Sequence, residues 1–161
     1  ISYIQVSKSA VLRDILNIIK KYNVDQNRLV IELTESGFIE SDRFFVSFCN
    51  RLKENGILLA LDDFGTGYSN FHYLYNLKPD CIKVDRGLMK NALANQYENM
   101  LLKHMIDMAH SVGVKMCIEG IETQEELDKI LEMGCDYIQG YYFSKPLPFN
   151  EIEEYLKKKR K

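Results

Sequence analysis

The sequence of 161 residues lacks Trp, contains only 3 Pro and 9 Gly, and has no excess of charge of either sign. It also lacks an apolar run near the ~18–20 residues that a membrane span requires, and no signal-peptide pattern opens it. The low Pro and Gly content excludes a collagenous or low-complexity chain. The remaining composition, 46% hydrophobic and 27% charged, is typical of one soluble globular domain.

Charge and cysteine usage exclude two further classes of protein. The 21 Lys and Arg residues nearly balance the 23 Asp and Glu, so the formal net charge of -2 creates no general attraction for polymeric nucleic acid. The basic tail Lys157–Lys161 is expected to be a solvated chain end. The 4 Cys form no CxxC pair, which indicates reduced thiols in a cytoplasmic protein rather than a zinc site or a disulfide scaffold.

Short β-rich runs alternate with amphipathic helical patterns along the chain. The runs are nearly continuous in hydrophobicity, which is typical of parallel strands buried on both faces. One of the helical patterns begins with Thr123-Gln-Glu-Glu126, a capping box. The predicted strands are Ile1–Val6, Leu29–Thr34, Ile57–Leu61, Cys81–Val84, Val114–Ile118 and Tyr137–Gly140.

About six βα units with short connections predict one α/β domain, either an open doubly wound sheet or a (β/α)8 barrel. No GxGxxG motif follows the first strand, so the dinucleotide-binding form of the open sheet has no support. In a barrel, functional groups project from the carboxyl ends of several different strands.

Polar residues stand at the end of every predicted strand. One charged residue there is usually a solvated cap, but several carboxylates buried together are unfavourable unless cations compensate them. Oxygen ligands without a His or Cys cluster favour a hard cation, Mg²⁺ or Mn²⁺. We therefore expect a metal site on one polar rim. The residues are Gln5, Glu32, Glu35, Asp62, Asp63, Lys83, Asp85, Glu119, Glu122 and Gln139.

Asp62 and Asp63 are adjacent, so their carboxylates can reach two metal ions or bridge them. Two ions ~3.5–4 Å apart activate water and stabilise the leaving oxygen in phosphodiester hydrolysis. Lys83 can orient water or offset phosphate charge. A Schiff-base role for Lys83 is the alternative, although neighbouring carboxylates favour its ammonium form.

The loop Phe64-Gly-Thr-Gly-Tyr-Ser-Asn70 follows the aspartate pair, and its glycines allow the backbone to turn sharply and approach a ligand. We interpret it as an active-site loop that Glu35 anchors. The 3 His lie within helical patterns or after this loop and never at a strand end, so we expect them to be structural.

Five motifs carry a resemblance to a known family. They are Glu32-Leu-Thr-Glu-Ser36, Asp62-Asp-Phe-Gly-Thr-Gly-Tyr-Ser69, Ile82-Lys-Val-Asp85, Glu119-Gly-Ile-Glu122 and Gln139-Gly-Tyr-Tyr-Phe-Ser-Lys-Pro-Leu-Pro148. In this order they resemble the EAL-domain family, phosphodiesterases that linearise the bacterial second messenger cyclic di-GMP. The resemblance runs from Ile1 to about Leu156.

The resemblance implies a TIM-barrel-type EAL fold and metal-dependent attack of water on one phosphodiester of cyclic di-GMP, giving linear pGpG. It implies that Glu32 and Asp62 bind the first ion, and that Asp62 and Asp63 share the second. Lys83 would contact the attacking water, and Glu119 would support metal and water as a base.

The resemblance also implies roles around these ligands. Gln139 would complete the rim, and Glu122 would support the metal site. Glu35 would hold the loop that begins at Phe64. The segment from Tyr142 to Pro146 would lie near a guanine.

Two departures from the family pattern bear on activity. Gln5 in Ile4-Gln-Val-Ser7 corresponds to the family's Asn ligand, and its extra methylene moves the ligand atom by ~1.5 Å. The Glu-Ala-Leu motif is absent, and in the family its Glu is a metal ligand on a strand that would precede Ile1. A complete barrel takes ~200–250 residues. We therefore expect residues 1–161 to be the C-terminal two-thirds of one EAL domain, lacking two strands and inactive alone.

Two functions remain open at this point. The retained metal ligands favour a phosphodiesterase in the intact domain, whereas Gln5 favours a catalytically inactive EAL domain that acts as a cyclic di-GMP receptor or protein-interaction module. The resemblance further implies a homodimer built on the helix after Lys83. It also implies an upstream sensor or GGDEF-type domain in the parent protein.

Overall fold

The centre of the molecule is a five-stranded parallel sheet in the order β1-β2-β3-β4-β5. The computed structural model describes residues 1–8, 10–34, 43–65 and 71–159. Each strand pairs with the next one along the chain, and helices connect the neighbours, which confirms the predicted α/β fold. The strands are β1 (Val30–Thr34), β2 (Leu58–Phe64), β3 (Cys81–Val84), β4 (Lys115–Ile118) and β5 (Tyr137–Ile138).

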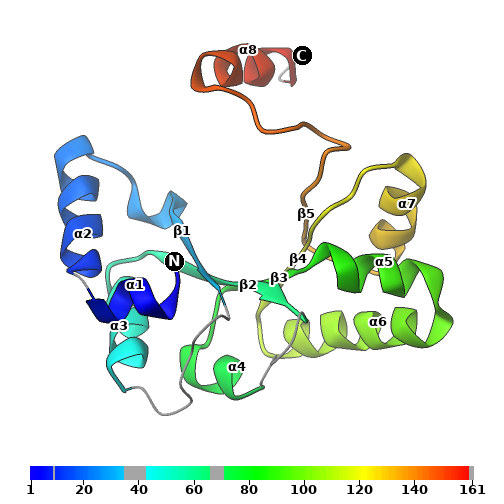
Figure 1. Cartoon of the computed structure of the whole chain (residues 1–161), viewed down its shortest axis with the longest axis horizontal. Coiled ribbons are helices and arrows are strands. Elements are labelled where there is room, and N and C mark those ends of the chain that lie inside the picture. The colour runs from blue at the N-terminus through cyan, green and yellow to red at the C-terminus, as the bar shows by residue number, and fades with distance from the viewer. Residues whose placement is uncertain (9, 35–42, 66–70, 160–161) are drawn as a thin grey trace.

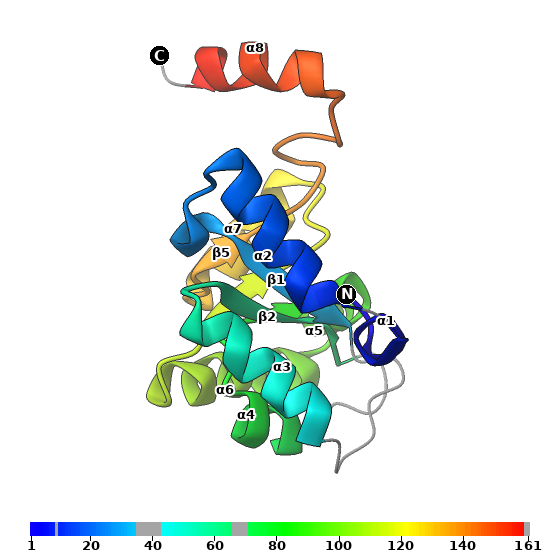
Figure 2. The same cartoon turned by 90° about the vertical axis from the view of Figure 1, so that its left-hand side faces the viewer.

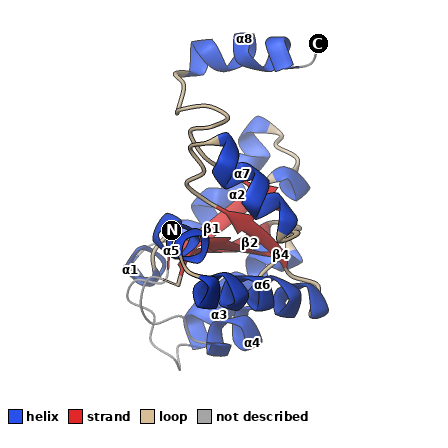
Figure 3. Cartoon of the chain, turned by 90° about the vertical axis from the view of Figure 1, so that its right-hand side faces the viewer, coloured by secondary structure: helices blue, strands red, loops and turns tan. Residues whose placement is uncertain are grey.

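Most helices lie in an arc around one side of the sheet, whereas α8 stands apart from the strands (Figures 1, 2 and 3). Within the described residues, no helix is long and apolar enough to cross a membrane. The helices are α1 (Tyr3–Lys8), α2 (Val11–Tyr22), the 3₁₀ helix η1 (Gln26–Arg28), α3 (Arg43–Glu54), α4 (Phe71–Leu77), α5 (Arg86–Ala94), α6 (Gln96–Ser111), α7 (Gln124–Glu132) and α8 (Phe149–Lys159).

The two faces of the sheet differ in burial because side chains alternate along each strand. Leu59 and Ile82 face the helices and are fully buried in the apolar core. On the other face, Val30 and Leu58 are 49% and 39% exposed near the amino ends of their strands. Lys83 lies on this second face and is only 7% exposed. The sheet therefore carries a buried charge at the carboxyl end of its less covered face.

The predicted strand Ile1–Val6 is wrong beyond its first residue. The Ile1 amino group donates to the Glu32 carbonyl at 2.6 Å, and the Ile1 carbonyl accepts from the Thr34 amide at 3.2 Å. This pattern is that of a parallel bridge beside β1. Helix α1 then begins at Tyr3.

The reason is a capping pattern in the first residues. Ser2-Tyr-Ile-Gln5 matches the Ser-x-x-Gln form of a capping box. The Gln5 Oε1 atom accepts from the Ser2 amide at 2.8 Å. A helix places Ile4 and Val6 on different sides, and Ile4 is half exposed while Val6 is buried. The alternation of apolar residues was therefore a misleading signal over this short stretch.

Two aspartates bind backbone amides at the amino end of the sheet. Asp80, just before β3, accepts from the Leu59 amide at 2.8 Å. Asp136, just before β5, accepts from the Met116 amide at 2.8 Å, and it also pairs with Lys115 at 2.7 Å. Each aspartate thus joins the start of its own strand to the start of the preceding strand.

Asp136→Asn is expected to lower the free energy of unfolding by about 1–2 kcal/mol at neutral pH. Burial alone would raise the pKa of Asp136, but hydrogen bonds from Lys115, the Met116 amide and His110 outweigh it and lower this pKa to about 2. Such a carboxylate stabilises the fold above its ordinary pKa of 3.8, and the contribution disappears as the pH falls through about 2. Urea unfolding of both proteins between pH 7 and 2.5 measures the effect. A difference that does not shrink in acid contradicts it.

Candidate metal and phosphodiester site

Charged side chains from four strands meet at the carboxyl edge of the sheet. Glu32 belongs to β1, Asp62 to β2 and Lys83 to β3, while Glu119 follows β4 directly. The strands are parallel, and Thr34 lies beside Asp62 in the β1–β2 pair. Their carboxyl ends therefore share one edge, as the sequence predicts.

Lys83 connects three of these groups. Its Nζ atom lies 2.7 Å from Glu32 Oε1, 2.8 Å from Asp62 Oδ1 and 2.9 Å from Glu119 Oε1. Burial alone would lower the pKa of Lys83, but hydrogen bonds to Asp62, Glu32 and Glu119 raise it well above its usual range. The side chain is therefore an ammonium ion, which argues against the Schiff-base alternative.

The carboxylates of Asp62 and Asp63 lie close together, although the two residues are adjacent in β2. Adjacent residues of a regular strand point to opposite faces. Here the register between β2 and β3 shifts between Leu61 and Phe64, and Asp63 adopts a φ of 57°. Carboxylate oxygens of Asp62, Asp63 and Glu119 consequently lie within 4.8 Å of one another.

The electrostatics of this group call for a cation. Burial raises the pKa of Asp63, and the neighbouring charges of Asp62 and Asp85 raise it further. Burial also raises the pKa of Glu119, although Lys83 opposes the rise. A divalent ion would relieve both effects, and carboxylate oxygens are the ligands that Mg²⁺ and Mn²⁺ prefer.

A cavity of about 440 Å³ adjoins Glu119 at the same edge. The Arg86 guanidinium lies on its wall and binds Glu122 Oε2 at 2.6 Å. The Arg86 side chain packs against Gly120, whose φ is +79°, so closely that a Cβ there would stand 2.5 Å from Arg86 Cγ. The cavity is lined by Arg86, Glu119, Gly120, Glu122, Gln139, Gly140, Tyr141, Ser144, Lys145 and Pro146.

Some of the predicted site residues line this cavity beside Glu119. Glu122, Gln139 and Pro146 line it, as expected. Tyr141 lines it as well, whereas the Tyr142 hydroxyl binds Gln124 on α7. Arg86 was not among the predicted site residues, although its position directly after the Lys-Val-Asp motif was a usable signal, and the structure places it at the start of α5.

Two other predicted site residues, Gln5 and Glu35, are not found at the rim among the described residues. Gln5 lies on α1, where its amide oxygen binds Ser2, so its interpretation as the last polar residue of a strand is wrong. Without that strand, the comparison of Gln5 with a family Asn ligand loses its basis. Glu35 and residues 66–70 of the predicted loop lie outside the described residues.

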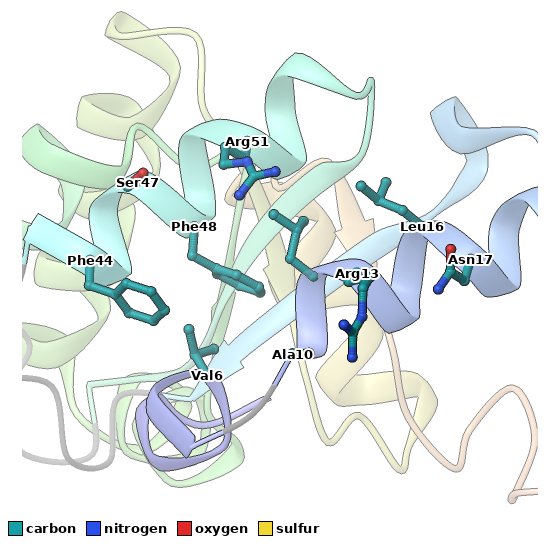
Figure 4. A pocket seen from close by; sticks show the side chains of 10 residues that line it. Val6, Ala10, Arg13, Leu16, Asn17, Phe44, Ser47, Phe48 and Arg51 are labelled. Atoms are coloured by element: carbon teal, nitrogen blue, oxygen red, sulfur yellow. The ribbon is translucent and has the colours of Figure 1, made fainter.

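A separate pocket of about 370 Å³ lies between α1, α2 and α3 (Figure 4). Arg13 and Arg51 come from opposite helices, and Val6, Phe44 and Phe48 contribute apolar surface. None of the described residues that line it is acidic, and Arg13 and Arg51 make its surface positive. We assign it no part in the site.

Comparison with known proteins identifies relatives of this chain. The EAL domain profile matches residues 1–146. The chain is 33% identical over 147 residues to the cyclic di-GMP phosphodiesterase PdeL of Escherichia coli, covering 91% of this chain and 41% of that protein. It is 38% identical over 129 residues to the cyclic di-GMP phosphodiesterase NbdA of Pseudomonas aeruginosa, covering 80% of this chain and 16% of that protein. It thus spans less than half the length of these relatives.

Solved structures show the same fold. The EAL domain of Mycobacterium smegmatis DcpA superposes with a TM-score of 0.90 at 28% identity, covering 98% of this chain and 71% of that one. The EAL enzyme Bd1971, solved with cAMP and cyclic di-GMP bound, superposes with a TM-score of 0.89 at 26% identity. That match covers 96% of this chain and 41% of the Bd1971 chain. The neighbours establish that the parallel sheet is part of a TIM-barrel-type fold.

Proposed function

Because the chain belongs to the EAL domain family, we propose that it carries the site of a metal-dependent phosphodiesterase that converts cyclic di-GMP to linear pGpG in bacterial signalling. One observation carries this proposal: four carboxylates and one ammonium group converge at the carboxyl edge of the sheet. The proposal treats residues 1–161 as the C-terminal two-thirds of one EAL domain, and the match to DcpA covers 71% of that chain.

The carboxylate oxygens suit one or two Mg²⁺ or Mn²⁺ ions. Glu32, Asp62, Asp63 and Glu119 are the residues that would hold them, and the 4.8 Å grouping of three of these fits a hard cation. A divalent ion at such a site activates water and stabilises the leaving oxygen of a phosphodiester.

Side chains of this chain would orient the attacking water, accept its proton and hold the loop beside the site. Lys83 would orient the attacking water and offset charge on the phosphate, as the family resemblance implies. Glu119 would accept the proton of that water. Glu35 would hold the loop after Phe64, as the family resemblance implies.

The cavity beside Glu119 is the proposed place of the nucleotide. Arg86 and Lys145 provide positive charge on its wall, and Tyr141 and Pro146 provide flat apolar surface for a guanine. Glu122 supports this wall through Arg86. Tyr142 supports the same segment through Gln124.

A homodimer built on α5, the helix after Lys83, is a further part of the proposal. Beside α5, Tyr97, Met100 and Leu101 of α6 are 70%, 54% and 46% exposed. Such an apolar surface suits a homodimer. An upstream sensor or GGDEF-type domain and a cytoplasmic location complete the proposed context.

Hydrolysis of cyclic di-GMP tests the function directly. We expect no turnover by residues 1–161 alone, because the family's Glu-Ala-Leu ligand is missing from them. A hybrid with the amino-terminal part of the DcpA EAL domain placed before Ile1 is expected to form pGpG only with Mg²⁺ or Mn²⁺. Chromatography of the products measures this. Micromolar binding of cyclic di-GMP by the hybrid without turnover would instead support the alternative, a catalytically inactive receptor.

A further inference from the structure

Lys83 donates to three of the four proposed metal ligands. An ammonium group has three N–H donors, and the three short contacts go to Glu32, Asp62 and Glu119. We propose that Lys83 is an internal cation that holds the ligand set together and competes with the divalent ion for it. This inference rests on the metal site of the proposed function. It adds that Lys83 limits how tightly this site binds the divalent ion.

Geometry supports the competition. A metal ion would bind carboxylates of this set at distances shorter than those to the ammonium nitrogen. The oxygens of Asp62 and Glu119 that form the 4.8 Å group with Asp63 belong to carboxylates that Lys83 already contacts. A metal ion would therefore share two carboxylates whose negative charge Lys83 already offsets in part.

Charge supports it as well. Glu32, Asp62, Asp63 and Glu119 carry four negative charges at this edge, and Lys83 reduces the sum by one. Two like charges a few ångströms apart repel each other strongly where burial limits solvent screening. Lys83 is only 7% exposed, so its repulsion of a divalent ion is poorly screened. Removing its charge should therefore tighten metal binding.

Isothermal titration of the full chain with Mn²⁺ and Mg²⁺ tests the sign of this effect. We expect Lys83→Met to bind Mn²⁺ at least tenfold more tightly than the original chain. Lys83→Arg keeps the charge and should bind no more tightly. Lys103→Met is the matched control, because it removes one positive charge from the surface of α6, and its affinity should stay within twofold.

A purely structural role for Lys83 predicts the opposite order. Loss of the ammonium would then disperse the carboxylates and weaken metal binding, and unchanged or weaker binding by Lys83→Met overturns the inference. A tenfold gain in Lys83→Arg also overturns it, because packing rather than charge would be responsible.

A second measurement covers the case in which Lys83→Met does not fold. In the original chain with ¹⁵N-labelled lysine, the Lys83 ammonium signal should shift and its protons should exchange faster when Mg²⁺ is added. An unchanged Lys83 signal at a saturating metal concentration overturns the inference. Because neither readout uses turnover, failure of hydrolysis alone leaves it standing, whereas absence of metal binding by all variants refutes both the inference and the metal site.

Discussion

Replacing Asp62 by asparagine will weaken the binding of Mg²⁺ or Mn²⁺ at least about a hundredfold, since even residues behind metal ligands change affinity ten- to a hundredfold. Asp62, like Glu119, belongs to both groupings at this edge. It contacts Lys83 at 2.8 Å and belongs to the carboxylate group with Asp63 and Glu119. The amide keeps the shape of the side chain but removes one negative charge and one ligand oxygen.

Asp80→Asn is the matched control for this change. Asp80 lies at the opposite edge of the sheet, where it accepts from the Leu59 amide, and an Asn oxygen can accept the same hydrogen bond. We expect its metal affinity to equal that of the original chain. Titration with Mn²⁺ measures both variants, and equal affinity of Asp62→Asn and Asp80→Asn would exclude Asp62 as a ligand. In the hybrid domain, Asp62→Asn should also abolish measurable pGpG formation.

Gly140→Ala will lower the free energy of unfolding by about 3 kcal/mol, near the upper end for overpacking. A Cβ at this position would stand 2.0 Å from the carbonyl oxygen of Ile121 and 2.5 Å from its nitrogen. These are backbone atoms that also bond to the same segment, because the Ile121 carbonyl accepts from the Tyr142 amide at 3.0 Å. Ile121 and Gly140 therefore cannot move apart to admit a methyl group unless the hydrogen bonding between the turn after β4 and the segment after β5 is broken.

Gly134→Ala is the matched control. It measures the loss of stability when a glycine is replaced at a place where the added methyl group meets no neighbour. Gly134 has a φ of +76°, but nothing lies within 4 Å of its Cβ position, so about 1 kcal/mol of backbone strain is the expected loss. Urea denaturation followed by circular dichroism compares the two variants. The prediction is wrong if Gly140→Ala costs no more than Gly134→Ala. In the hybrid domain, Gly140→Ala should also impair nucleotide binding, because Gly140 lines the cavity beside Glu119.

The sequence could predict which side chains share the rim, because parallel strands place all their carboxyl ends at the same edge of the sheet. Glu32, Asp62 and Lys83 follow apolar runs, and a parallel sheet must bring such ends to one edge. The sequence could not show how Asp63 joins them. That placement depends on the shift in register after Leu61 and on a left-handed residue, and neither leaves a periodic pattern.

The error over the first residues has a local origin. The apolar alternation of Ile1–Val6 competed with a capping box, and the Gln5 side chain accepts a hydrogen bond from the Ser2 amide at the start of the helix. A hydrogen bond of this kind leaves no hydrophobic pattern in the sequence. The placement of Tyr142 near a guanine stays a prediction, and its neighbour Tyr141 lines the cavity.

The aspartates at the amino edge separate one part of the fold's support from the ligand edge. Asp80 and Asp136 bind the starts of neighbouring strands without touching the carboxyl edge, where the ligands lie. Replacing a ligand carboxylate such as Asp62 or Asp63 therefore leaves these two hydrogen bonds in place. In a mutational scan scored separately for abundance and for metal binding, changes at Asp80 and Asp136 should mainly lower abundance, and changes at Asp62 and Asp63 should mainly lower metal binding.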